Sequence, residues 1–150
     1  MTKHFTLEEL TFSQTAARKG IDNTPNEEQK QNLLNLCIHV LEPVRHFLRE
    51  PLRIGSGFRS DKLNKAIGGA TRNGVSTSQH CEGKAADLVC RGRNAEIFRY
   101  LKNLDVDQVI WEFGTDQEPQ WVHVSWNGSE NRNQYLKAIK RNGKTQYIKL

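Results

Sequence analysis

Two histidines and one aspartate are the residues of this chain whose types and spacing suit a metal site. His80 and Asp87 lie seven residues apart in the stretch SQHCEGKAAD, and His123 follows later in QWVHVSW. Two neutral imidazoles and a carboxylate suit zinc, and three protein ligands leave one position for water, as in catalytic zinc sites. The same spacing also fits packed histidines and an aspartate that accepts backbone hydrogen bonds. The helices and strands that carry the three residues decide whether their side chains can meet.

The patterns around Asp87 and His123 predict strands. In QWVHVSW, Val122 and Val124 face one side and His123 faces the other, because side chains alternate along a strand. Asp87 lies in the middle of a short apolar strand, and a buried carboxylate without a partner is costly. A turn at Gly83 would bring His80 back toward Asp87, so the three side chains can meet.

Helices are predicted before these strands. The capping box TLEE at 6–9 begins a helix that we expect to run to about Arg18. In TPNE at 24–27, the threonine is the expected N-cap of a long amphipathic helix. Pro43 lacks a backbone donor and should bend or break that helix.

The second half of the chain predicts a small sheet. The segments 108–113 and 120–126 are rich in β-branched and aromatic residues and form a predicted hairpin. Asn142-Gly143 lies between two further β-like segments, which indicates a second hairpin. The expected fold class is α+β, with N-terminal helices packed on a small, mostly antiparallel sheet, and residues 1–150 form one expected domain.

Composition and charge narrow the classes of protein. The net charge is +5, and the segment 131–150 contains basic residues but no acidic ones. Such a basic surface favours binding of a polyanion, either nucleic acid or an anionic cell wall. Alternatively, it is a solvated face that binds no partner. No apolar run approaches the ~20 residues of a membrane span. The N-terminus lacks the apolar core of a signal peptide, so we expect synthesis in the cytoplasm.

Three motifs carry a resemblance to a known family. SGFRS, SQHCEGKAAD (which reads S-x-H-x-x-G-x-A-x-D) and WVHVS occur in this order. They resemble the zinc D-alanyl-D-alanine carboxypeptidase and L-alanyl-D-glutamate endopeptidase family, whose fold is shared with the Hedgehog signalling domain. The N-terminal stretch FTLEELTFSQTAARKGIDNTP and the closing NGKTQYI resemble the small phage and prophage members of that family.

The resemblance implies roles for individual residues. His80, Asp87 and His123 would bind one zinc ion, as the residues alone also suggest. Arg59 would bind a carboxylate of the substrate, because its planar guanidinium can form two parallel hydrogen bonds with one carboxylate. Without the resemblance, Arg59 could equally pair with a surface acid. Ser78 would assist Arg59, and the implied substrate is the peptidoglycan stem peptide.

The general base is where the sequence departs from several relatives. These relatives carry an acidic residue three positions before the last histidine, and here that residue is Gln120. We predict Glu112, on the partner strand of the hairpin, as the base. Asp116 and Glu118 lie in the join of the hairpin, where we expect solvent exposure. A register shifted by one residue would turn Glu112 to the wrong face.

The predicted function is hydrolysis of an amide bond in the stem peptide, as a carboxypeptidase or an endopeptidase. The alternative is a zinc-containing module of the same fold that binds wall peptides without cutting them. Binding of nucleic acid would explain the charge but not the three metal ligands, so no specific nucleic acid is expected. The protein would act as a monomer on the bacterial wall after release, through a pore-forming partner or cell breakage.

Overall fold

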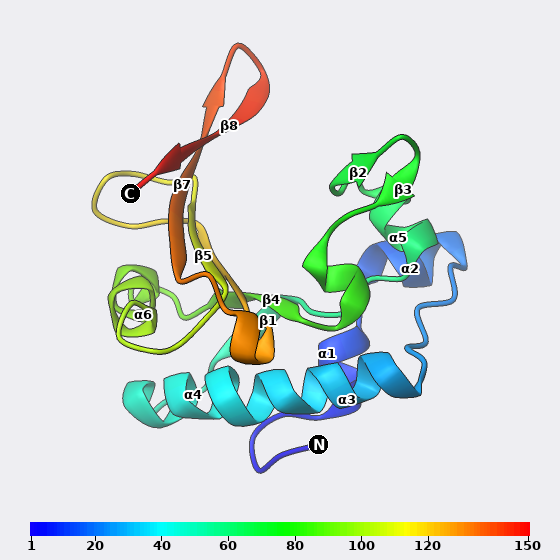
Figure 1. Cartoon of the computed structure of the whole chain (residues 1–150), viewed down its shortest axis with the longest axis horizontal. Coiled ribbons are helices and arrows are strands. Elements are labelled where there is room, and N and C mark those ends of the chain that lie inside the picture. Colours follow the sequence, from blue (N-terminus) through cyan, green and yellow to red (C-terminus); the bar gives the residue numbers. More distant parts are fainter.

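A six-stranded sheet forms the centre of the computed structural model, which describes residues 1–150 (Figure 1). Its strands, in spatial order, are β1 (Arg53–Ser56), β4 (Ala85–Val89), β6 (Trp121–Ser125), β5 (Gln108–Glu112), β7 (Gln134–Arg141) and β8 (Lys144–Lys149). All neighbours are antiparallel except β5 and β7, which run parallel. The mixed α/β class and the mostly antiparallel sheet match the sequence prediction.

The helices precede and flank these strands. They are α1 (Leu7–Thr11), α2 (Gln14–Lys19), α3 (Glu27–Leu36), α4 (Glu42–Leu48), α5 (Asp61–Ala66) and α6 (Asn94–Leu101), with the shorter turns η1 (Cys37–Leu41), η2 (Gln79–Glu82) and η3 (Gly128–Glu130). None of these helices combines the length and the apolar character that crossing a membrane requires.

The first predicted helix is divided in two. Thr6 caps α1 as expected, since its side chain accepts from the backbone N–H of Glu9. Ser13 then accepts from the N–H of Ala16 and begins α2, so the helix predicted to reach about Arg18 is interrupted near Phe12. Because Ser13 caps the backbone N–H groups at the start of α2, the chain can end one helix and begin another within this segment.

The long helix begins later than predicted. Asn26, not Thr24, is its N-cap, and Asn26 and Gln29 form a reciprocal capping box. Thr24 instead donates to Asp22 at 2.6 Å. Asparagine caps helices at least as well as threonine, so the box two residues further on is favoured.

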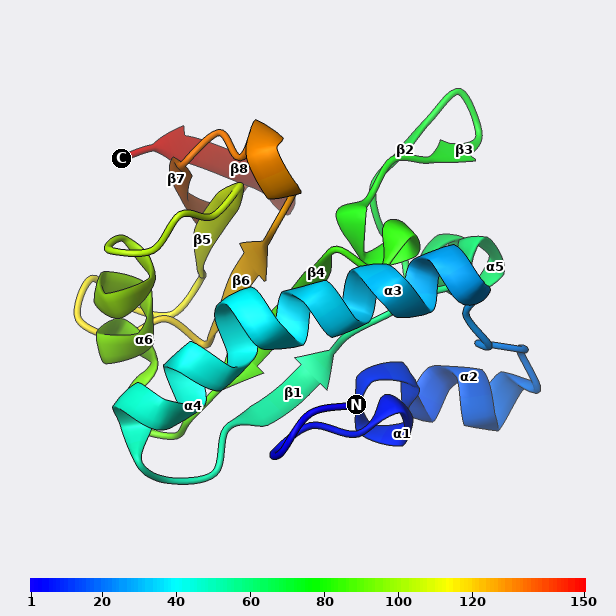
Figure 2. The ribbon, with the colours of Figure 1, turned by 60° about the horizontal axis from the view of Figure 1, so that its bottom comes forward.

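Pro43 perturbs this helix without ending it. The five residues before α4 form the π-helical segment η1, in which the N–H of Glu42 bonds to the carbonyl of Cys37. Pro43 lies in the first turn of α4, where its missing donor costs little. The helical path from α3 to α4 therefore continues along one side of the sheet (Figure 2).

One face of the sheet contributes to the buried core and the other remains available for chemistry. Leu33, Leu36 and Val40 of the long helix are fully buried in one cluster with Val122 and Val124 of β6. Because side chains alternate, Trp121, His123 and Ser125 point to the opposite face. The predicted hairpin of β5 and β6 thus aims His123 away from the core.

A small hairpin lies at residues 71–76, before the turn that carries His80. The strands β2 (Thr71–Arg72) and β3 (Val75–Ser76) pair with each other in a separate sheet. Asn73 and Gly74 both have positive φ at its tip, which is the geometry of a tight hairpin turn. This hairpin and the β7–β8 hairpin project on either side of the molecule in Figure 1.

Candidate metal centre and substrate cleft

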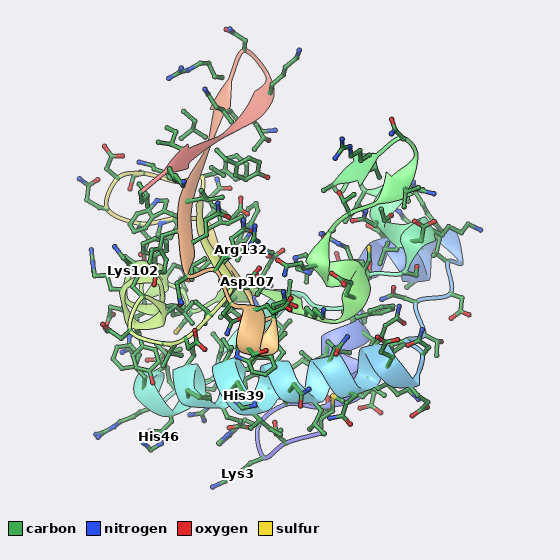
Figure 3. All side chains as sticks on the ribbon, viewed as in Figure 1. Lys3, His39, His46, Lys102, Asp107 and Arg132 are labelled. Carbon is green, nitrogen blue, oxygen red and sulfur yellow. The ribbon has the colours of Figure 1, made fainter.

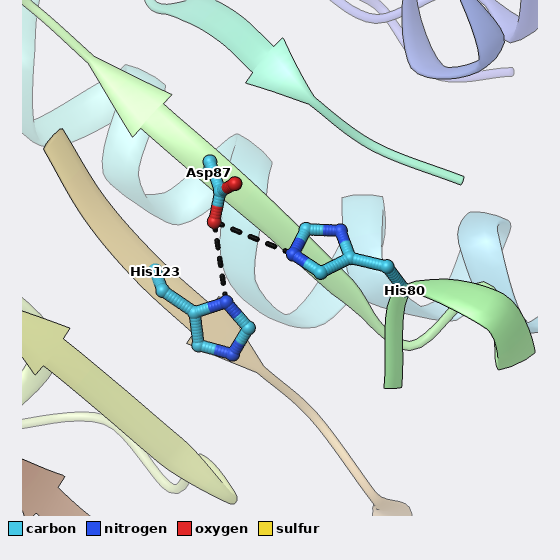
Figure 4. A group of neighbouring side chains, drawn as sticks. All are labelled: His80, Asp87 and His123. Atoms are coloured by element: carbon cyan, nitrogen blue, oxygen red, sulfur yellow. Dashed lines mark hydrogen bonds and ion pairs between the residues drawn. The ribbon is translucent and has the colours of Figure 1, made fainter. Parts of the chain in front are cut away.

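His80, Asp87 and His123 converge from three elements (Figure 4). Asp87 of β4 lies directly opposite His123 of β6, and His80 comes from η2. The Oδ1 of Asp87 is 3.2 Å from Nδ1 of His123 and 3.4 Å from Nε2 of His80. One ligand atom from each residue lies within 4.8 Å of the others, so the group is able to hold a metal ion.

The hydrogen bond of His80 shows that its second nitrogen suits a metal. Nδ1 of His80 lies 2.7 Å from the carbonyl oxygen of Gly57, and a carbonyl only accepts, so Nδ1 carries the proton. In the neutral ring, Nε2 then presents a lone pair to the carboxylate of Asp87. Two acceptors facing each other are stabilised by a cation between them, either a proton or a metal ion, and a histidine fixed by a carbonyl in this way is typical of metal ligands. The donor set therefore fits a zinc ion.

The carboxyl group of Asp87 is held in its charged form. Its burial opposes ionisation, but the positive charges that the rings of His80 and His123 carry when they are protonated, together with the hydrogen bond from His123, outweigh this effect and hold the pKa of Asp87 well below its ordinary value. His80 is 2% exposed and His123 is 9% exposed, so the cluster is shielded from water on most sides. A permanently charged carboxylate among buried imidazoles is the form that binds a divalent cation.

The turn that carries His80 is fixed at both ends. Ser78 caps η2, and its hydroxyl accepts from the backbone N–H of His80 at 3.2 Å. Gly83 ends η2 with φ of 74°, and a Cβ there would lie 2.5 Å from the carbonyl oxygen of Gln29 in α3. Asn32 donates to the carbonyl of Glu82 at 2.8 Å, so α3 also supports the turn.

Arg59 lies beside the cluster with unused donor capacity. Its Nη2 donates to the hydroxyl of Ser78 at 3.1 Å, while its buried Nε has no hydrogen-bond partner. Burial lowers the pKa of Arg59, although Asp87 and Glu112 counteract this effect. A guanidinium always remains charged in proteins, so this buried N–H leaves one donor of Arg59 without an acceptor.

Glu112 faces the same cleft as the three candidate ligands. It pairs with Trp121 in the β5–β6 hairpin, and this register turns its side chain to the face of His123. Burial raises the pKa of Glu112 to about 7, and Asp87 contributes, while His123 and Arg59 act in the opposite direction. A carboxylate with a pKa near neutrality is suited to accepting and returning a proton.

The other acidic candidates point elsewhere. Asp116 forms an ion pair with Lys137, and Glu118 accepts from the backbone N–H of Ala95 at 2.6 Å. Gln120 lies with Glu118 at a second, separate hollow. Of the acids considered from the sequence, Glu112 is the one that lines the cleft with His80, Asp87 and His123.

The cleft has two walls and a volume of about 640 Å³. One wall contains Arg59, Ser78 and the segment 67–70, which precedes the β2–β3 hairpin. The other contains residues of β7 and β8, including Lys140 and Tyr147. This volume is in the range of sites that hold small ligands or short peptides.

An ion pair between the buried Asp107 and the exposed Arg132 lies beside the cleft, and sequence reasoning did not find it. Asp107 is 1% exposed and accepts from Arg132, with 2.7 Å between Oδ2 and Nη2 (Figure 3). The same carboxylate accepts from Nε2 of Gln79, next to His80, at 2.9 Å. The only local sign of this ion pair in the sequence is that Asp107 immediately precedes a predicted strand. Its partner Arg132 lies 25 residues further along the chain, so the pairing could not be predicted.

The cluster could hold a metal ion, and the family model that the chain matches is one of metallopeptidases. The chain matches the family model of peptidase M15 over residues 3–125, and it belongs to this family. Peptidases of this family depend on a metal, and the His80–Asp87–His123 cluster could bind one. A comparison with curated proteins gave no match. The resemblance identified from the three motifs is therefore confirmed at the level of the family.

Proposed function

We propose that this chain is a zinc-dependent peptidase domain, residues 1–150, that hydrolyses an amide bond of the peptidoglycan stem peptide. The observation that carries the proposal is the buried His80–Asp87–His123 cluster, in which the Nε2 lone pair of His80 faces a carboxylate. Membership of the peptidase M15 family supports the hydrolytic activity. The basic segment 131–150 supports an anionic substrate such as the bacterial wall.

His80, Asp87 and His123 would hold the zinc ion, which when bound polarises a carbonyl and lowers the pKa of water toward about 7. Glu112 would accept the proton of the attacking water and deliver it to the leaving amine. Its position in the cleft and its raised pKa support this role.

Arg59 and Ser78 would orient the substrate. The free Nε of Arg59 and the hydroxyl of Ser78 lie on one wall of the cleft, next to His80. A substrate carboxylate bound by Arg59 would place the adjacent amide beside the metal ligands. The bond that is cut depends on which carboxylate binds there, so both carboxypeptidase and endopeptidase activity are consistent with this arrangement.

The proposal is tested by digesting purified peptidoglycan in the presence of zinc and identifying the released peptides by mass spectrometry. The wild-type protein should release fragments from one defined bond, and that bond identifies the activity. The variant His80→Ala should release none. His46→Ala is the matched control, since His46 is exposed on α4, away from the cleft (Figure 3). Equal product from wild type and His80→Ala would contradict the proposal.

A second candidate is a zinc-containing module that binds wall peptides without cutting them. Gln120, in place of the acid found in several relatives, motivates this alternative. The position of Gln120 outside the cleft argues against it, because Glu112 already supplies a carboxylate there. The variant Glu112→Gln distinguishes the two: a peptidase loses turnover while it retains zinc and peptide, whereas a binding module shows no turnover even in the wild type.

A further inference from the structure

The second wall of the cleft is built from residues beyond the part of the chain that matches the family. The match ends at residue 125, and the β7–β8 hairpin, which includes Lys140 and Tyr147, follows it. Figure 1 shows this hairpin extending from the sheet, on the opposite side from the β2–β3 hairpin. Residues of β7 and β8 nevertheless line the cleft together with the candidate metal ligands.

The strand register aligns Tyr147 with the proposed base. Glu112 of β5 pairs with Ala138 of β7, and Ala138 pairs with Tyr147 of β8. Residues directly opposite each other in a sheet point to the same face, so all three side chains lie on one side of the sheet, and those of Glu112 and Tyr147 line the cleft. Ala138, which lies between the other two in this register, is fully buried and has the smallest side chain of the three.

The environment of Tyr147 agrees with this placement. Burial raises the pKa of its phenol, and the carboxylates of Glu112 and Asp87 raise it further, so the ring lies within the field of the site. Tyr147 is still 55% exposed. A large aromatic side chain that lines a cleft and keeps one accessible surface provides a contact area for a peptide.

Lys140 is the free cation of the same wall. It lies two residues after Ala138 on the cleft-facing side of β7, is exposed, and has no carboxylate partner. Its Nζ is 5.6 Å from the ring centre of Phe113, which holds it at the rim of the cleft. By contrast, Lys137 on the opposite face of β7 pairs with Asp116, and Arg132 pairs with Asp107.

We propose that the β7–β8 hairpin is the specificity arm of the enzyme. Lys140 binds a carboxylate of the peptide different from the one bound by Arg59, and Tyr147 packs against the peptide between them. The substrate class is therefore a peptide with at least two carboxylates, held by cations on opposite walls of the cleft. This inference rests on the proposed function, because it assumes that the cleft binds a stem peptide.

The test measures the binding of two synthetic peptides by calorimetry in the presence of zinc. One is L-Ala-γ-D-Glu-L-Lys-D-Ala-D-Ala, and the other is the same peptide with the α-carboxylate of the glutamate amidated. All proteins carry Glu112→Gln, so that the peptides remain intact. Lys140→Met is compared with Lys144→Met, which removes the same charge from the outward face of the same hairpin.

Lys140→Met should weaken binding of the acidic peptide about fivefold and leave the amidated peptide unchanged. Lys144→Met should change neither affinity, and Tyr147→Ala should weaken both peptides. Equal affinities of the Lys140→Met and Lys144→Met proteins for the acidic peptide would overturn the inference, as would failure of either peptide to bind.

Turnover by the protein with Glu112 intact separates this inference from the proposed function. If that protein cleaves the peptide while Lys140→Met behaves like Lys144→Met, the specificity arm is wrong and the peptidase function stands. If it cleaves neither peptide but the affinities follow the expected pattern, the arm is supported as a binding element and the proposed hydrolysis is wrong.

Discussion

At the scale of single residues, the site depends on how few conformations its supporting residues can adopt. The carbonyl of Gly57 fixes the tautomer of His80, the hydroxyl of Ser78 fixes its backbone, and Gly83 turns the chain into β4. Each contact restricts the position of one imidazole. A ligand that is held in place before the ion arrives loses little entropy on binding, which raises metal affinity.

Gly83→Ala should lower the free energy of unfolding by about 2 kcal/mol or more. The added Cβ would meet the backbone of α3 and would also require a positive φ. Gly74→Ala is the control, because Gly74 has a similar φ of 78° with open space around it, and it should cost only about 1 kcal/mol. Urea denaturation of the two variants checks this difference, and equal losses would contradict it.

The residues that could be predicted from the sequence are those fixed by alternation within one hairpin. The face of His123 follows from the valines beside it, whereas the face of Glu112 depends on the register of the β5–β6 pairing, which the structure supplies. The contributions of Lys140 and Tyr147 could not be predicted in this way. They depend on the parallel pairing of β5 with β7, which joins segments separated by β6 and for which no local signal exists.

At the scale of elements, the Asp107 carboxylate connects three segments that the sequence leaves independent. Asp107 precedes β5, Gln79 belongs to η2, and Arg132 precedes β7. Burial alone would raise the pKa of Asp107, but the hydrogen bonds from Arg132 and Gln79 outweigh it and lower the pKa. The buried charge thereby holds the His80 turn against the sheet.

Asp107→Asn should reduce the free energy of unfolding at pH 7 by about 2–3 kcal/mol, because the buried carboxylate loses its charge-assisted hydrogen bonds from Arg132 and Gln79. A lowered folded-state pKa means that this stabilisation is complete above the unfolded value of about 3.9 and disappears as the pH falls through the folded value. The difference between wild type and variant should therefore shrink below about pH 4.

Denaturant titrations at several pH values measure this difference. Asp105→Asn is the matched control, because Asp105 is exposed and should contribute less than about 0.5 kcal/mol at any pH. A loss in Asp107→Asn that stays constant from pH 7 to pH 3 would show that the charge of Asp107 is not responsible.

Helix boundaries show a different limit of sequence reasoning at this scale. The capping box at Asn26 competed with the one predicted at Thr24, and both obey the same rule. Pro43 was correctly expected to disturb the long helix, but the outcome depends on packing. Leu41 and Val44 on either side are fully buried, so the helix retains its core contacts by widening into η1 instead of breaking.

At the scale of the whole molecule, one face of the sheet packs in the core and the other lines the cleft. The face with Leu88, Val122 and Val124 belongs to the buried core, whereas the opposite face carries Asp87, His123 and Glu112. Stability and chemistry therefore depend on alternate residues of the same strands. Substitutions on the cleft face can change function with limited effect on the core. A metal ion bound by the cluster would add to the stability, because it would bind only the folded state.

Zinc should raise the melting temperature of the wild-type protein. A ligand present at 100 times its Kd adds about 2.7 kcal/mol to the stability, which corresponds to about 5–10 °C for a chain of this size. A chelator should reverse the shift. The His80→Ala protein should show no comparable increase in thermal denaturation measured by circular dichroism, and a full shift in that variant would place the zinc elsewhere.

The most direct test of the central claim is the zinc content of the purified protein after chelation and reloading, measured by atomic emission. We predict one zinc ion per chain in the wild type and in His46→Ala. We predict less than one tenth of this amount in His80→Ala and in His123→Ala, while circular dichroism shows both to be folded. One retained zinc per chain in either ligand variant would contradict the account of this site.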